Sequence, residues 1–242
     1  MQERYLGDVH DFYKFNFLEY LSIMINEKIG LNWYLNNPQN IGKNEVKLND
    51  GEIRSFLVKE NYRSQNLKLI NDIKHLELKK NRSIQNYLQK SYLNKHIDFY
   101  NRKLTIDNRV KWFKSSLTFF KNNNFLFLDP DNGLQNQKAN FRSKRSVKYI
   151  KYSEIESLYE SKKVIIFCQF QSFTMNHREM LELKINSIKK YLGLKGKVPV
   201  IRNRSGPNTF YLIIGSTKKI KQLKPLLENY VKKNPLTQLL EF

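Results

Sequence analysis

Two short, wholly apolar runs constrain this chain more than any other feature of its sequence. Phe125-Leu-Phe-Leu128 and Val164-Ile-Ile-Phe-Cys168 contain no polar side chain apart from a thiol, and more than 30 residues separate them. Such runs are typical of strands buried on both faces, as in a parallel sheet. Helical periodicity predicts a helix over residues 107–121, before the first run, and another over residues 175–192, after the second. We therefore predict an α/β protein with an open, mostly parallel sheet.

The first hundred residues continue this alternation. Phe12 to Met24 has apolar residues every third position and predicts a helix, and Ile29–Leu35 predicts a strand. Residues 40–62 are polar and rich in turn formers, which predicts a loop. Residues of about 60–105 are expected to form a mainly helical insertion on a single domain that spans residues 1–242, and a strand is expected near Ile97 to Leu104.

The last hundred residues predict two further helices and a pair of strands. Ser153-Glu-Ile-Glu156 fits a capping box at the start of a helix. Strands at Val198–Arg202 and Thr209–Ile214 flank the turn sequence Ser205-Gly-Pro-Asn208, which predicts an antiparallel hairpin. In the final helix Pro225 is expected to delay the start or to bend the helix, because proline lacks the backbone N–H.

The net charge of +21, from 43 Lys and Arg against 22 Asp and Glu, indicates a polyanionic partner. The excess is uneven, since no acidic residue occurs between Leu183 and Leu227. Nucleic acid, either DNA or RNA, is the favoured partner, and a solvated basic face without a partner is the alternative. Phosphate contacts are expected from six basic residues: Arg142, Lys144, Arg145, Lys148, Arg202 and Arg204.

Other classes of protein are disfavoured by what the sequence lacks. No apolar run approaches the roughly 20 residues of a membrane helix, and the first residues do not form a signal peptide. The single cysteine, Cys168, excludes an internal disulfide framework and a cysteine-based zinc site. The four His residues are scattered, so no metal site is predicted. We expect a cytoplasmic protein without a membrane partner.

Two segments carry the candidate chemistry. Asp129-Pro-Asp-Asn-Gly133 directly follows a buried strand, and ligands of open α/β sheets bind outside the carboxyl ends of the strands. Near the start, Asp8, Asp11 and Lys14 are three residues apart and share one side of a helix. The alternatives are an ordinary tight turn for the first segment and a helix cap with a surface ion pair for the second.

These two segments together resemble a known family layout. Gly7-Asp8-x-x-Asp11-Phe-x-Lys14 with Asp129-Pro-Asp-Asn-Gly-Leu134 is similar to a group of methyltransferase-like bacterial proteins. It is more distantly similar to the bacterial 23S rRNA adenine-N6 methyltransferases, which begin with a Gly-Asn-x-x-Asp-x-x-Lys helix. The resemblance spans most of the chain outside residues 60–100. It implies a Rossmann-like sheet of the class I methyltransferase type that ends in an antiparallel hairpin.

The resemblance also implies roles for individual residues. Asp129 and Pro130 stand where amino-methyltransferases carry an Asp-Pro-Pro-aromatic motif, whose first side chain and adjacent carbonyl accept hydrogen bonds from the target amino group. The candidate catalytic residues continue through Asp131 and Asn132, which replace the second proline and the stacking aromatic. No glycine-rich loop follows the first strand. The implied cofactor is S-adenosylmethionine, and the residues implied to bind it are Gly7, Asp8, Asp11, Lys14 and Trp33.

Two alternatives to methyl transfer follow from the same loop. An Mg²⁺-dependent nuclease would use Asp129 and Asp131 with Glu160-Ser-Lys162, because such enzymes combine metal-binding carboxylates with a lysine near the attacked phosphate. A catalytically degenerate methyltransferase fold would act only as a nucleic-acid-binding module. The preferred prediction is a nucleic-acid-binding enzyme that methylates a base amino group.

Overall fold

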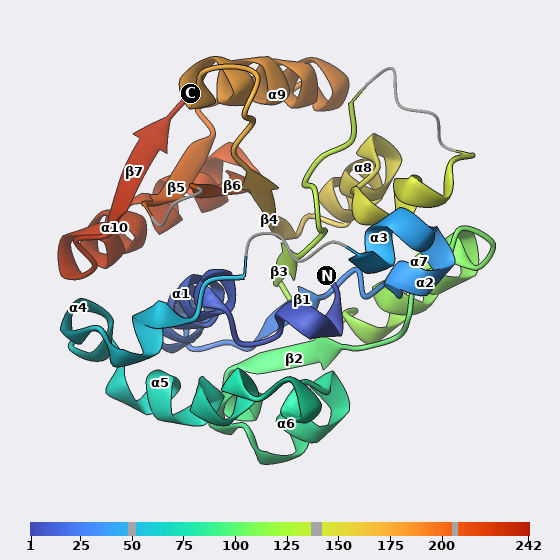
Figure 1. The fold of residues 1–242 in the computed structure, drawn as a ribbon. Coiled ribbons are helices and arrows are strands. Elements are labelled where there is room, and N and C mark those ends of the chain that lie inside the picture. Colours follow the sequence, from blue (N-terminus) through green and yellow to red (C-terminus); the bar gives the residue numbers. More distant parts are fainter. Residues whose placement is uncertain (48–51, 137–141, 205–207) are drawn as a thin grey trace.

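The computed structural model describes residues 1–47, 52–136, 142–204 and 208–242. Its centre is a seven-stranded sheet in the order β2-β1-β3-β4-β6-β5-β7 (Figure 1). The strands are β1 (Ile29–Asn32), β2 (Ile97–Tyr100), β3 (Phe125–Leu128), β4 (Val164–Phe170), β5 (Pro199–Asn203), β6 (Thr209–Ile214) and β7 (Thr237–Glu241).

The first four strands of this order are parallel, and the last three alternate in direction. β1 pairs in parallel with both β2 and β3, and β3 pairs in parallel with β4. β6 lies antiparallel between β4 and β5, so β5 runs in the same direction as β4. The predicted mostly parallel sheet and the β5–β6 antiparallel pair are therefore confirmed, whereas Ser205 to Pro207 of the predicted turn lie outside the described residues.

Helices cover both faces of the sheet and divide the core into two clusters. Alternate residues of β3 point to opposite faces, with Phe127 in one cluster and Leu126 and Leu128 in the other. The first face is covered by α1 (Val9–Ile25), α5 (Leu67–Ile73), α6 (Ile84–Lys90) and α10 (Thr217–Lys233). The second is covered by α7 (Arg109–Phe119), α8 (Tyr152–Glu160) and α9 (His177–Leu192).

α1 is a central helix rather than a surface one. The Asp8 side chain caps it by accepting hydrogen bonds from the backbone N–H groups of His10 and Asp11. Apolar residues surround most of the helix, and Phe12, Phe15 and Phe17 are all fully buried. A helix that is apolar on several sides lies inside a protein, and this position carries Lys14 into the interior with it.

Several expectations for single elements need correction. α8 begins at Tyr152 with Lys151 as its N-cap, so the capping box expected at Ser153 is two residues late, and Glu154 supplies the box contact to the backbone N–H of Lys151. α10 begins at Thr217 and contains Pro225 in its interior, so it does not begin late. Residues 40–62, expected as loop, include the short helices α2 (Pro38–Ile41), α3 (Lys43–Lys47) and α4 (Glu60–Arg63).

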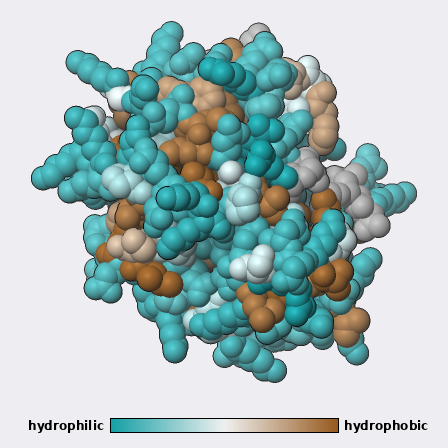
Figure 2. All heavy atoms as spheres, turned by 90° about the vertical axis from the view of Figure 1, so that its left-hand side faces the viewer, coloured by the Kyte–Doolittle hydropathy of each residue, from teal (hydrophilic) through white to brown (hydrophobic). Residues whose placement is uncertain are grey.

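Residues 60–105 combine short helices with a strand, as expected, and the strand is shorter than the expected range of Ile97 to Leu104. Short helices fill residues 60–95, but β2 belongs to the central sheet, where Ile97 pairs with Ile29. The outer surface in Figure 2 is largely hydrophilic, with apolar residues in separate patches. Among the described residues, no helix combines the length and the apolar character that crossing a membrane requires.

Candidate functional site at the carboxyl edge of the sheet

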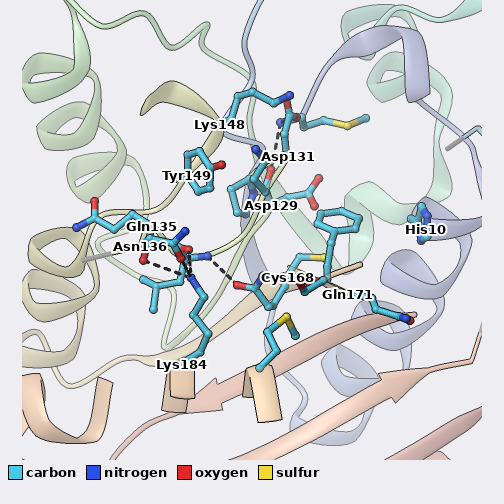
Figure 3. Close-up of a pocket in the computed structure, with 18 of the residues that line it drawn as sticks. His10, Asp129, Asp131, Gln135, Asn136, Lys148, Tyr149, Cys168, Gln171 and Lys184 are labelled. Atoms are coloured by element: carbon cyan, nitrogen blue, oxygen red, sulfur yellow. Dashed lines mark hydrogen bonds and ion pairs between the residues drawn. The ribbon is translucent and has the colours of Figure 1, made fainter. Parts of the chain in front are cut away.

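A large cavity opens at the edge of the sheet where β3 and β4 end. Its volume is about 1460 Å³. The start of α1, the segment after β3, the segment that leads into α8, the loop after β4 and the inner side of α9 line it (Figure 3). Pockets for one small molecule usually measure about 300–1,000 Å³, so this cavity has room for more than one group.

Lys14 joins the two candidate segments. Its ammonium donates to Asp11 Oδ1 at 2.5 Å and to Asp129 Oδ2 at 2.6 Å, and all three side chains are buried. Burial disfavours the charged ammonium, but Asp11 and Asp129 outweigh it and hold the pKa of Lys14 above its ordinary value. Lys14 thus brings the two candidate segments together at one place.

The aspartates around Lys14 exceed its single positive charge. Burial, opposed by Lys14, raises the pKa of Asp129. Burial and the charge on Asp11 raise the pKa of Asp8 well above its ordinary value. Asp8, Asp11 and Asp129 all line the cavity, so its floor favours a cationic or hydrogen-bond-donating group.

Gly7 and Trp33 support the floor from behind and do not line the cavity. The Gly7 N–H donates to Asp11 Oδ2 at 2.7 Å, and Gly7 has a φ of 78°, which suits a residue without Cβ. Trp33 is fully buried, and its ring lies 4.6 Å from the Lys14 ammonium. Both residues were predicted to bind a cofactor, but the structure places them in contact with residues of the floor instead.

Asp131 is held by an independent set of contacts. The Met1 ammonium lies 2.5 Å from Asp131 Oδ1, and Gln2 Nε2 donates to Oδ2 at 2.8 Å. Burial acts to raise the pKa of Asp131, but the Met1 ammonium, with Lys148 and Gln2, lowers it. Beside it, Asn132 donates its backbone N–H to the Lys148 carbonyl, so this part of the loop is anchored to the segment before α8.

Gly133 lets the same loop turn back over the end of β4. Its φ is 78°, and a Cβ at this position would collide with the side-chain amide of Gln169. Gln169 Oε1 instead accepts from the Leu134 N–H at 3.0 Å. Gln169 lines the cavity, as expected for a polar residue in a strand that ends beside Asp129.

A buried ion pair that sequence reasoning missed holds one cavity wall. Arg109 Nε donates to Glu154 Oε1 at 2.7 Å, and the Tyr34 hydroxyl donates to Glu154 Oε2 at 3.0 Å. Arg109 also donates to the carbonyls of Ser146 and Tyr149, which fixes the segment that carries Lys148. Arg109 and Glu154 are 45 positions apart, so no sequence periodicity connects them. In a chain rich in Arg and Lys, one helical arginine also gives no signal of its own.

The six predicted phosphate-binding residues fall into two groups. Lys148 lines the cavity and lies 2.6 Å from Glu45 Oε1, near the exposed Arg142, Lys144 and Arg145. Arg202 and Arg204 are at the carboxyl end of β5, at the same edge of the sheet as the cavity but outside its lining. Arg202 donates to Asn208, which in turn donates to the cavity residue Gln171.

Other lining residues escaped the sequence analysis. Lys184 projects from α9, and burial lowers its pKa to about 8. Gln135 Oε1 and the Tyr211 hydroxyl are buried without a hydrogen-bond partner among the described residues. Burial lowers the pKa of His10 to about 4, which keeps its ring neutral at pH 7. Lys184 and Tyr211 lie within α9 and β6, so neither a strand end nor a motif identified them.

The residues of the nuclease alternative do not come together. Asp129 and Asp131 follow the carboxyl end of β3, whereas Glu160 and Lys162 precede β4. β3 and β4 are parallel, so these two pairs are at opposite edges of the sheet. In the described ranges, no group of three His, Cys, Asp or Glu residues is arranged to hold a metal ion.

Comparison with known proteins adds no assignment. Neither a protein-family model nor a curated protein matches this chain. Proposals about function therefore rest on the site itself.

Proposed function

We propose that this protein binds nucleic acid and transfers a methyl group from S-adenosylmethionine to an amino group of a base. The observation that carries the proposal is the Asp129 carboxylate, which follows β3 at the cavity floor with Oδ2 bonded to Lys14. In doubly wound sheets this edge is where ligands bind. The resemblance of Asp129-Pro130 to the motif of amino-methyltransferases supports the same role.

In the proposed reaction, Asp129 and the Pro130 carbonyl accept hydrogen bonds from the amino group of the base. Bound S-adenosylmethionine would supply the methyl group on a sulfonium. The amino nitrogen forms the new bond to the methyl carbon, the carbon–sulfur bond would break with its electron pair staying on sulfur, and the nitrogen passes a proton to the Asp129 carboxylate. Lys14 holds the Asp129 carboxylate in place, and Asp131 and Asn132 fix the loop beside it.

The residues that are present fit a cationic cofactor by charge and by space. Asp11 and Asp129 share the single positive charge of Lys14, so the floor keeps one negative charge in excess, which a sulfonium would neutralise. The raised pKa of Asp8 favours the neutral form of that third carboxyl. The cavity volume of about 1460 Å³ exceeds the usual size for one small molecule and leaves room for a base beside the cofactor. Basic residues outside the floor suit the phosphates of a strand.

A binding module without catalysis is the second candidate, and Asn132 favours it. The methyltransferase motif carries a stacking aromatic at this position, whereas Asn132 is half-buried and its backbone N–H is bonded to Lys148. Such a module would bind nucleic acid through the basic residues and would leave Asp129 as a structural partner of Lys14.

Transfer of a labelled methyl group to a mixture of single-stranded DNA and RNA distinguishes the two candidates. We expect the unaltered protein to label nucleic acid and Asp129→Asn to lose at least about 100-fold in rate, because an amide cannot take up the proton. Asp107→Asn, an exposed residue outside the cavity, is the matched control and should keep full activity. Equal labelling by both variants would contradict the proposal.

A further inference from the structure

Three lysines line the cavity, and their partners differ in kind. Lys14 is bonded to two aspartates, and Lys148 is paired with Glu45. Lys184 Nζ donates to the Leu134 carbonyl at 2.8 Å and to Asn136 Oδ1 at 2.6 Å. Within the described residues no carboxylate forms an ion pair with Lys184, so its charge is solvated by dipoles and not neutralised.

Lys184 also stands apart from the acidic floor. Figure 3 shows Gln135, Asn136 and Lys184 together at one end of the cavity, with His10 and Gln171 at the other and Asp129 between them. Apolar side chains of Met180 and Leu183 line the cavity from the same helix as Lys184. Burial with no anionic partner is why the pKa of Lys184 falls to about 8.

Gln135 places a hydrogen-bond acceptor without a donor at this end of the cavity. Its side chain lines the cavity, only 7% of the residue is exposed, and Oε1 has no hydrogen-bond partner among the described residues. A buried acceptor without a donor is unfavourable, and a hydroxyl or amino group of a ligand would satisfy it. The ligand for this end therefore carries an anion beside a hydrogen-bond donor.

We propose that the Lys184 end of the cavity is a phosphate subsite for one nucleotide of the bound strand. The phosphate contacts Lys184, and a sugar hydroxyl donates to Gln135 Oε1. The excess of aspartates at the floor repels a phosphate, which leaves the Lys184 end as its place inside the cavity. The inference deepens the proposed function and rests on it for the class of ligand. The carboxylate of S-adenosylmethionine is the other source of an anion.

Calorimetric titration with adenosine 5′-monophosphate and with adenosine, in the absence of S-adenosylmethionine, tests this subsite. The unaltered protein should bind the monophosphate roughly 10- to 100-fold more tightly, the value of a hydrogen bond to a charged group. Lys184→Met should remove this difference without changing adenosine binding, and Lys184→Arg should retain most of it. Lys190→Met, on the exposed side of α9 and outside the cavity, should change nothing.

Three results would overturn the proposal. One is no measurable monophosphate binding, or equal affinity for both compounds, in the unaltered protein. Another is an equal loss in Lys184→Met and Lys190→Met, which would show a general surface attraction. The third is that Lys184→Met weakens binding of S-adenosylmethionine but leaves binding of 5′-methylthioadenosine and of the monophosphate unchanged. That result would identify the cofactor carboxylate as the anion that Lys184 binds. Failure of the proposed methyl transfer appears separately, as lack of labelling with Lys184-dependent monophosphate binding intact.

Discussion

Lys14 is buried and Lys184 is half-buried in the same cavity, yet their environments shift the pKa in opposite directions. Two aspartates outweigh the burial of Lys14 and raise its pKa, whereas Lys184 has only carbonyl and amide oxygens and its pKa falls to about 8. The difference shows that burial alone does not decide the role of a charged group. Lys14 is part of the fold as well as of the floor, while Lys184 is available to a ligand.

Replacing Lys14 should have the largest effect on stability. Lys14→Met would leave the Asp11 and Asp129 carboxylates buried without their shared cation. Breaking a buried pair by removing one partner costs about 3–5 kcal/mol, and we expect a loss of that size in the free energy of unfolding. Denaturant unfolding followed by circular dichroism measures it, and a loss below about 1 kcal/mol would contradict the central place given to Lys14.

The pH dependence of stability should separate the two lysines. The pKa of Lys184 is lower in the folded state than in the unfolded chain, so the unfolded chain binds more protons between about pH 8 and its ordinary value near 10.5. The free energy of unfolding of the unaltered protein, minus that of Lys184→Met, should therefore rise as the pH increases through this window. Lys14 has a raised pKa, so its contribution is fully present in the same window and is lost only at higher pH.

This prediction is measured by denaturant unfolding of the unaltered protein and Lys184→Met at pH 7, 9 and 10. The difference between the two proteins isolates Lys184 from other groups that titrate. A difference that stays constant or moves in favour of Lys184→Met with rising pH would contradict the lowered pKa.

The smallest effect is expected for Lys184→Met at pH 7. The substitution removes hydrogen bonds to Leu134 and Asn136 but also removes a buried charge that no carboxylate neutralises. These terms oppose each other, so the free energy of unfolding should change by no more than about 1 kcal/mol. A loss comparable to that of Lys14→Met in the same unfolding assay would show that Lys184 is structural.

The sequence predicted most of the sheet because its strands are strongly apolar. β3 and β4 are buried on both faces, and runs such as Phe125–Leu128 leave little alternative. β7 was missed because Thr237–Glu241 is an edge strand with two exposed residues and no regular alternation, and only its pairing with β5 defines it. The late start expected from Pro225 was wrong, because α10 begins at Thr217 and continues through the proline.

The candidate site was predicted in part for a similar reason. Asp129 follows a buried strand and Lys14 shares a helical side with Asp11, so local rules identified both segments. Gln135 and Lys184 are 49 positions apart and meet only through the packing of α9 beside the loop after β3. Glu160 and Lys162 were assigned to the site in error. Their Glu-x-Lys spacing matched a nuclease pattern, but the two residues precede β4 and lie at the opposite edge of the sheet from Asp129.

Calorimetric titration of the purified protein with S-adenosylmethionine and S-adenosylhomocysteine tests the central claim most directly. The account predicts micromolar binding of both compounds. Asp11→Asn removes one floor carboxylate and leaves Lys14 paired with Asp129, so it should weaken binding of the sulfonium compound, S-adenosylmethionine, at least about 10-fold. Binding of neither compound by a folded protein that still binds nucleic acid would contradict methyl transfer and leave the binding module.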